Sequence, residues 1–234
     1  MIDIHSHILP GIDDGARNFE ESVGLVRELA AQGVTDIIAT PHYVNETTYT
    51  SPVFANEKLL EELRGFVRDA GIDVNLYLGN EIYIDSDILG LVKKGEMKAL
   101  ADSEYLLVEL PFNEKISNYE DIFAVLLENG YKVLLAHPER YSYFHDEYEK
   151  LVDLIDMGVL FQCNLGSVTG KYGKSAMKIV RKLAKDGYIF AFGNDAHHVG
   201  RNDYLELGYK KLAKFYNERE LEKVLVGNAK KIIS

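Results

Sequence analysis

Short apolar runs alternate along this chain with longer segments that have helical periodicity. The apolar runs are rich in β-branched residues, and they predict strands at 2–5, 36–40, 74–79, 105–109, 132–137, 159–163 and 188–193. Apolar positions spaced three and four residues apart predict helices between them, at 19–32, 52–70, 119–129, 148–157 and 175–185. This alternation is typical of repeated β-α units around a parallel sheet.

Glycines mark where the predicted helices end. Five of these helices are followed by a glycine, the usual stop before a strand: Gly33, Gly71, Gly130, Gly158 and Gly187. Two further helical stretches, 204–216 and 218–233, have no strand after them, so they close the barrel or cover one face. No linker-like stretch or change of composition divides the chain. We therefore expect one α/β domain over residues 1–234, a distorted TIM-like (β/α)7 barrel.

Composition and charge narrow the class of protein. Hydrophobic residues make up 47% and charged residues 27% of the 234 residues, values typical of a globular domain. The net charge of −11 disfavours a nucleic-acid partner, because such proteins need a basic face. The single cysteine, Cys163, allows no internal disulfide and favours the cytoplasm. No apolar run approaches the roughly 20 residues that cross a bilayer, so we expect no direct membrane insertion.

Metal-binding side chains recur at the ends of the predicted strands. Histidines, aspartates and glutamates stand at or just after six strand ends, or in the loop after the first one: His5, His7, Asp14, His42, Glu81, Glu109, His137, Asp195 and His197. The carboxyl ends of barrel strands meet on one face, where barrel enzymes collect their catalytic groups. Nine such residues are too many for one ion, so the pattern predicts a site for two or three ions.

The spacing of two pairs supports this interpretation. His5 and His7, like Asp195 and His197, are two residues apart, and side chains at that spacing point to the same face of a strand. Each residue alone has an ordinary explanation, because a lone histidine is more often buried and neutral and a lone glutamate is more often solvated. Those explanations do not account for the shared position of these residues at strand ends.

Several motifs match a known family over the full chain. Residues 3–16 read DIHSHILPGIDDGA, and further matching segments lie at 20–22, 33–35, 39–43, 79–81, 137–141 and 194–197. Together they resemble the metal-dependent protein tyrosine phosphatases of the PHP (polymerase and histidinol phosphatase) superfamily, which bacterial capsule and exopolysaccharide operons encode. The specific part is Leu9-Pro10-Gly11 followed by Asp13-Asp14-Gly15. The His-x-His pair alone is common to the whole superfamily.

The resemblance implies a site for three ions at the strand ends. It assigns His5, His7, Glu81 and Asp195 to a first ion, Glu81, Glu109 and His137 to a second, and Asp14, His42 and His197 to a third. Glu81 would then bridge two ions. Some superfamily members have histidine where this chain has Asp14 and Glu109. Oxygen ligands at those positions favour Mn²⁺, with Fe²⁺ and Zn²⁺ as the alternatives.

Charge and metal chemistry point to a phosphate substrate. Three divalent ions and four carboxylates would leave a local charge of about +2 in a protein of net charge −11, which attracts an anion. Two ions roughly 3.5 to 4 Å apart can activate a shared hydroxide for in-line attack on phosphorus. Arg140, three residues after His137, is the residue expected to hold the phosphoryl oxygens, because its planar fork binds two oxygens at once. Arg201 is a second candidate.

The implied substrate is phosphotyrosine on a protein. The resemblance points to the tyrosine-rich tail of a cognate bacterial tyrosine kinase that controls capsule or exopolysaccharide synthesis. A phenolate leaving group, with a pKa of about 10, needs little help from a general acid. His198 and Asp203 lie nearby in the sequence and are candidates for that role. The sequence gives no indication of the oligomeric state.

Other mechanisms fit the sequence less well. A cysteine-dependent phosphatase needs Cys-x5-Arg, but the sixth residue after Cys163 is Thr169. An amidohydrolase would need a lysine on the fourth strand and a histidine on the sixth, and neither is present. A nuclease of the same superfamily is disfavoured by the acidic charge. A catalytically silent metal-binding partner of a kinase would lack some ligands or Arg140. The strongest alternative is a small-molecule phosphomonoesterase of the histidinol-phosphatase type, with the same metals and another pocket.

Overall fold

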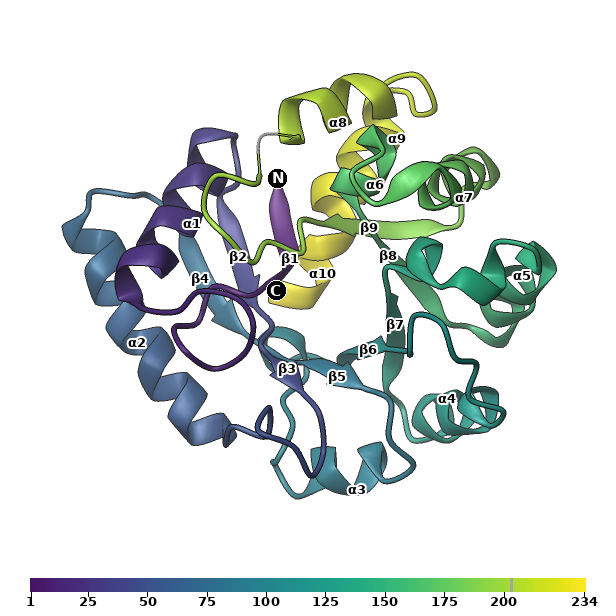
Figure 1. Cartoon of the computed structure of the whole chain (residues 1–234), viewed down its shortest axis with the longest axis horizontal. Helices are drawn as coiled ribbons and strands as arrows, with labels where there is room; N and C mark the ends of the chain where they lie inside the picture. The colour runs from purple at the N-terminus through teal and green to yellow at the C-terminus, as the bar shows by residue number, and fades with distance from the viewer. Residues whose placement is uncertain (203) are drawn as a thin grey trace.

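The strands form a ring with helices around its outside (Figure 1). The computed structural model describes residues 1–202 and 204–234, so the candidate acid Asp203 lies outside the described residues. The described strands are β1 (Ile2–Ser6), β2 (Asp36–Ala39), β3 (His42–Tyr43), β4 (Asn75–Leu78), β5 (Glu81–Tyr83), β6 (Tyr105–Glu109), β7 (Lys132–Ala136), β8 (Leu160–Asn164) and β9 (Ile189–Gly193). Every pairing between these strands is parallel.

Two of the predicted strands are each followed, after a short break, by a second short strand that was not predicted, and these breaks distort the barrel. The sheets have the orders β1-β2-β4 and β3-β5-β6-β7-β8-β9. The chain passes from β2 to β3 and from β4 to β5 after only two residues, so each pair continues one predicted strand into the second sheet. The ring closes between β9 and β1, where the amide of Asp195 donates to the carbonyl of His5 (2.8 Å) and that of His7 to Ala196 (3.0 Å). The predicted α/β barrel class is confirmed by this topology and by the solved structures described below.

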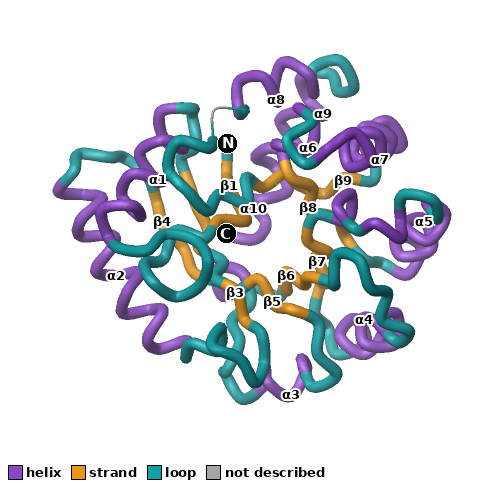
Figure 2. Tube along the Cα trace, viewed as in Figure 1, coloured by secondary structure: helices purple, strands orange, loops and turns teal. Residues whose placement is uncertain are grey.

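The helices lie outside the ring except at the C-terminal end of the chain (Figure 2). They are α1 (Phe19–Ala31), α2 (Val53–Asp69), α3 (Ile88–Lys93), α4 (Tyr119–Glu128), α5 (Tyr148–Met157), α6 (Leu165–Thr169), α7 (Gly173–Asp186), α8 (Leu205–Leu212), α9 (Glu218–Glu222) and α10 (Asn228–Ile233). The two unpredicted helices, α3 and α6, have six and five residues, too few to show a periodic pattern. None of the described helices has the length and apolar character needed to cross a membrane.

Side chains of each strand divide between two apolar layers. On β6, Leu106 and Val108 pack in the large layer beneath the surrounding helices, whereas Tyr105 and Leu107 belong to a smaller group inside the ring. This alternation follows from the two-residue period of a strand. Glu109, the next residue on the inner face, lies at the carboxyl end of β6. The inner face is therefore apolar at the start of the strand and acidic at its end.

The C-terminal helix α10 fills the apolar end of the ring. Ala229 and Ile232 are about 1% exposed and pack with Ile2, Ile4 and Tyr105 inside the ring. In Figure 1 this yellow helix lies within the ring rather than outside it. A plug at the amino-terminal ends of the strands leaves the opposite end open for chemistry. Of the two helical stretches predicted after the last strand, the second one, 218–233, thus closes the barrel, whereas the first one contains α8, which packs on α6.

Truncating this plug should destabilise the whole domain. Ile232→Ala removes a fully buried side chain, so we expect the free energy of unfolding to fall by about 2 to 4 kcal/mol. The control Leu207→Ala changes a side chain that is 48% exposed on α8 and should change this energy by less than about 0.5 kcal/mol. Urea unfolding followed by circular dichroism measures both. Equal effects would show that α10 does not support the barrel.

Candidate active site

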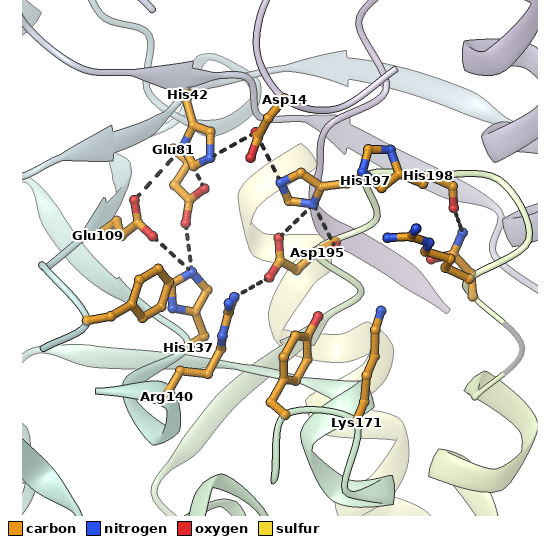
Figure 3. Close-up of a pocket in the computed structure, with 14 residues that line it drawn as sticks. Asp14, His42, Glu81, Glu109, His137, Arg140, Lys171, Asp195, His197 and His198 are labelled. Carbon is orange, nitrogen blue, oxygen red and sulfur yellow. Dashed lines mark hydrogen bonds and ion pairs between the residues drawn. The ribbon is translucent and has the colours of Figure 1, made fainter. Parts of the chain in front are cut away.

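The nine predicted side chains converge at the carboxyl ends of the strands. They surround a cavity of about 260 Å³, and Figure 3 shows seven of them on its wall: Asp14, His42, Glu81, Glu109, His137, Asp195 and His197. The other two, His5 and His7, are fully buried beneath it and reach the same carboxylate, Glu81. Residues from seven different segments of chain thus meet at one place.

Glu81 lies at the centre of the cluster, with its side chain only 1% exposed. Its Oε2 lies 3.1 Å from His5 Nε2, 3.2 Å from His7 Nε2 and 3.1 Å from His42 Nδ1. Its Oε1 lies 2.9 Å from His137 Nε2. Since the two carboxylate oxygens face different histidines, Glu81 has the geometry of a bridging ligand.

A cation accounts for contacts that protons alone do not satisfy. His5 Nε2 and His7 Nε2 are 3.2 Å apart, and two ring nitrogens at that distance can share only one proton. The buried Nδ1 of His42 has no hydrogen-bond partner although it faces Glu81 Oε2. Ligands about 2.1 Å from one ion lie roughly 3 to 3.4 Å from each other. These spacings fit a metal ion among the side chains.

Three overlapping groups of potential ligands have their donor atoms close enough together to hold an ion. They are His5, His7 and Glu81; His7, Asp14, His42 and His197; and His42, Glu81 and Glu109. In the second group, Asp14 Oδ1 lies 3.4 Å from both His42 Nε2 and His197 Nε2. His42 therefore faces carboxylates with both nitrogens. His137 Nε2 also approaches Glu109 Oε1, at 3.6 Å.

Burial and neighbouring charges shift the pKa values of several groups in this cluster. Burial, followed by the charges of Glu81 and Asp195, raises the pKa of Glu109 well above its ordinary value. Burial also lowers the pKa of His137 to about 4, so this ring is neutral and free to bind a metal. The pKa of His5 and that of His7 are instead raised by neighbouring carboxylates, which outweigh the effect of burial, so a metal ion would displace protons from these two rings. Carboxylates beside imidazoles form a donor set that suits divalent transition metals. The residues present therefore fit the implied metal centre.

Two polar partners orient the innermost histidines. The Nδ1 atom of His5 lies 2.8 Å from Gln162 Oε1, and that of His7 lies 2.7 Å from Asp13 Oδ2. A hydrogen bond at Nδ1 fixes the ring and directs Nε2 to the site, as is usual for metal-binding histidines. Gly15 permits the loop that carries Asp13, because a Cβ atom at Gly15 would lie 2.2 Å from the carbonyl oxygen of His7.

Asp195 connects the histidine cluster to Arg140. Its Oδ2 accepts hydrogen bonds from Arg140 Nη1 and Asn164 Nδ2, both at 2.7 Å. Its Oδ1 faces His197 Nδ1 at 3.3 Å and the Nε2 atoms of His5 and His7 at 3.7 Å. One carboxylate thereby fixes an arginine beside the candidate metal centre.

The backbone is strained at two of these positions. His137 has φ +32° and Asp195 has φ +50°, values uncommon for residues other than glycine. Both follow the last residues of their strands, where the chain turns sharply and presents the side chain to the cavity. Such strain persists only where surrounding contacts hold it, and it is frequent at functional sites.

The structure also places the two predicted arginines. Arg140 and Arg201 both line the cavity, as do the candidate acid His198 and the neighbouring Lys171. Arg140 is largely buried, with a side chain 24% exposed, whereas Arg201 is exposed. Arg140 is therefore held in the site, and Arg201 stands at its rim.

Sequence reasoning missed several residues that complete the site. Phe112 and Tyr172 line the cavity, and Gln162 and Asn164 hold His5 and Asp195. Gln162 and Asn164 had a usable signal, because they are polar residues on a strand, β8, that is otherwise apolar. No pattern in the sequence marked Phe112 and Tyr172 as site residues, since single aromatic residues in loops are common.

Comparison with known proteins identifies the family. A model of the family described as capsular polysaccharide synthesis, CpsB/CapC, matches residues 1–234. The chain belongs to this family. The resemblance deduced from the sequence motifs is thereby confirmed.

Individual relatives agree over nearly their whole length. The chain is 32% identical to the tyrosine-protein phosphatase YwqE of Bacillus subtilis (strain 168), covering 100% of this chain and 91% of the relative. It is 31% identical to the tyrosine-protein phosphatase CpsB of Streptococcus pneumoniae, covering 100% of this chain and 98% of that protein.

Solved structures support the fold. A structure from the work on YwqE and CpsB, described as unique metal-dependent tyrosine phosphatases, matches with a TM-score of 0.89 and 30% identity, covering 100% of this chain and 94% of that chain. Histidinol phosphate phosphatase from Lactococcus lactis subsp. lactis Il1403 matches with a TM-score of 0.61 and 13% identity, covering 91% of this chain and 92% of that one. At that identity the second match shows a shared fold alone.

Removing one negative charge should stabilise the metal-free protein. The pKa of Glu109 in the folded chain lies above its unfolded value of about 4.3, so its ionisation destabilises the metal-free fold as the pH rises above that value. We expect Glu109→Gln to raise the melting temperature of chelator-treated protein at pH 7 by about 2 °C or more, and to reduce the stabilisation that added Mn²⁺ provides.

Scanning fluorimetry with and without metal measures both effects. The control Glu114→Gln changes an exposed glutamate and should alter neither value. A lower melting temperature for metal-free Glu109→Gln would contradict a raised pKa of Glu109 in the folded chain.

Proposed function

We propose that this protein is a metal-dependent tyrosine-protein phosphatase that removes phosphate from phosphotyrosine on a protein partner. The family match over the full chain and the names of the relatives support the enzyme class. The observation that carries the proposal is the position of Arg140, fixed by Asp195 beside a cluster of carboxylates and histidines. A bound arginine next to a multinuclear metal centre is suited to phosphoryl transfer.

We assign the metal ligands as the sequence motifs imply. A first ion would be held by His5, His7, Glu81 and Asp195, a second by Glu81, Glu109 and His137, and a third by Asp14, His42 and His197. Carboxylates at Asp14 and Glu109, where some superfamily members have histidine, favour Mn²⁺. When bound, the ions supply Lewis acidity that activates water and offsets the charge of the phosphate.

The protein's own groups bind and orient the phosphoryl group. Arg140 donates one N–H to Asp195, which leaves its other donors available for phosphoryl oxygens. Its charge would stabilise the oxygens as the negative charge redistributes in the transition state. Arg201, exposed at the rim of the cavity, would contact the phosphate from the other side or attract it from solution.

The leaving group requires little from the chain. The phenolate of tyrosine is stable enough to depart with assistance from water, because its conjugate acid has a pKa of about 10. Among the described residues, His198 is the candidate general acid that would protonate the leaving phenolate, since it lines the cavity and is exposed to solvent. A half-buried cavity of about 260 Å³ leaves room for a phosphoryl group at its base and an aromatic ring toward its mouth.

We further propose that the partner is a cognate bacterial tyrosine kinase with a tyrosine-rich tail, and that this protein acts in the cytoplasm. This assignment rests on the resemblance and on the role that the family description gives in capsular polysaccharide synthesis. The fully buried and reduced Cys163 is compatible with a cytoplasmic protein. The competing function is hydrolysis of a small phosphate monoester such as histidinol phosphate.

A comparison of substrates tests the proposal. Metal-loaded protein should release phosphate from phosphotyrosyl peptides with a far higher kcat/KM than from histidinol phosphate, and excess chelator should abolish both activities. Release of inorganic phosphate measures the two reactions directly. A higher kcat/KM for histidinol phosphate would overturn the assignment.

Loss of the arginine should impair turnover more than metal binding. We expect Arg140→Ala to lower kcat/KM for a phosphotyrosyl peptide by about 100-fold or more, because a charged donor to the phosphoryl oxygens is lost. The control Arg219→Ala removes an exposed arginine of α9 and should retain full activity. Near-normal activity of Arg140→Ala, with normal metal content, would exclude the proposed role.

A further inference from the structure

The guanidinium group of Arg140 packs against two aromatic rings. Its Cζ atom lies 4.5 Å from the ring centre of Phe112 and 4.4 Å from that of Tyr172. Both rings line the cavity together with Arg140. These distances are well within the range of a favourable cation–π contact, roughly 6 Å from cation to ring centre.

The three residues come from three different loops. Phe112 follows β6, Arg140 follows β7, and Tyr172 directly precedes α7. The loop of Phe112 is bound to the loop of Arg140, since the amide of Ser142 donates to the carbonyl of Phe112 at 2.9 Å. Loops that are far apart in sequence thus place aromatic faces around one cation. A surface arginine with no binding role would not need this arrangement.

The two rings restrict the orientation of the Arg140 side chain, which lies among several carboxylates. An arginine side chain has several rotatable bonds, and here it lies beside the carboxylates of Asp195, Glu81 and Glu109. Without lateral support the guanidinium could turn fully onto these acids and lose the orientation that a phosphoryl group requires. Flat contacts with aromatic faces restrict rotation of the plane without occupying its N–H donors. Asp195 takes one donor, and the rings hold the rest in place.

We propose that Phe112 and Tyr172 are positioning residues that hold the guanidinium plane of Arg140 with its free N–H edge directed into the cavity. This inference rests on the role proposed for Arg140 and deepens it. The ring faces, rather than the Tyr172 hydroxyl, provide the effect. Tyr172 is the more informative of the two, because Phe112 also stacks on His137, with ring centres 5.4 Å apart, and so contacts a candidate metal ligand.

The hydroxyl of Tyr172 belongs to a separate set of contacts. It interacts with Asn164, the residue that donates to Asp195. Burial raises the pKa of Tyr172, so the ring remains a neutral phenol and offers Arg140 no negative charge. Ring and hydroxyl can therefore be separated by substitution. Tyr172→Phe keeps the aromatic face, and Tyr172→Leu removes it.

A double-mutant cycle tests the proposal. We expect Tyr172→Phe to stay within about threefold of the unmodified protein in kcat/KM, and Tyr172→Leu to lose roughly tenfold, as removal of a cation–π contact near 1.4 kcal/mol would give. In an Arg140→Ala background, Tyr172→Leu should have less than a twofold effect, because the group it positions is absent. The inhibition constant of inorganic phosphate should follow the same pattern.

The assay uses p-nitrophenyl phosphate with metal-loaded, full-length protein, so the cycle is independent of the natural substrate. If phosphotyrosyl peptides prove poor substrates but the cycle is non-additive, the proposed function fails and the positioning role stands. Additive losses in the double mutant, or an equal loss in Tyr172→Phe and Tyr172→Leu, would overturn the positioning role.

Two measurements separate positioning from general damage. Metal content should be unchanged in all variants, and Tyr172→Met replaces Tyr172→Leu in the cycle if the leucine variant binds less metal. Tyr188→Leu, which removes a half-buried tyrosine ring directly before β9, serves as the matched control. It should change melting temperature without changing the inhibition constant of phosphate. An equal change in that constant for Tyr188→Leu would also contradict the proposal.

Discussion

The burial of one carboxylate among four histidines is the constraint on which this structure depends. Glu81 is almost fully inaccessible, yet both of its oxygens face ring nitrogens at 2.9 to 3.2 Å. A charged group in such a place is costly unless cations compensate it. The barrel supplies the remaining ligands from several strand ends and fixes two of the histidines from behind through Gln162 and Asp13. The fold thus determines the position of the site: α10 fills the amino-terminal end of the ring, and the candidate ligands gather at the opposite end.

The chemistry of the site follows from a second shared carboxylate. Asp195 directs one oxygen to the histidines and the other to Arg140 and Asn164. In the proposed function, Asp195 would thus connect ion binding and phosphate binding through a single side chain. Two aromatic rings complete the support of Arg140 and leave its remaining donors for the substrate. With the proposed ions bound, the site would carry a local positive charge that attracts a phosphorylated partner to a protein with a net charge of −11.

Much of this could be predicted from the sequence because strands and ligands follow simple rules. The β6 and α5 boundaries agree with the predicted ranges, since their apolar patterns are uninterrupted. The convergence of the nine candidate ligands could be predicted because a histidine or an acid at a strand end reaches the same face of the barrel wherever it lies in the chain. The breaks between β2 and β3 and between β4 and β5 could not be foreseen, because they depend on how neighbouring strands pair. The same holds for the strained turns at His137 and Asp195 and for the aromatic contacts of Arg140, which exist only in the folded chain.

The central claim is that Glu81 joins two of three ion positions. Anomalous diffraction at the manganese absorption edge, from crystals grown with Mn²⁺, tests it most directly. The account predicts three anomalous peaks in the cavity, two of them beside Glu81, and the loss of these two in Glu81→Gln while the peak near Asp14 remains. Fewer than two peaks in the unmodified protein, or an unchanged set of peaks in Glu81→Gln, would contradict it.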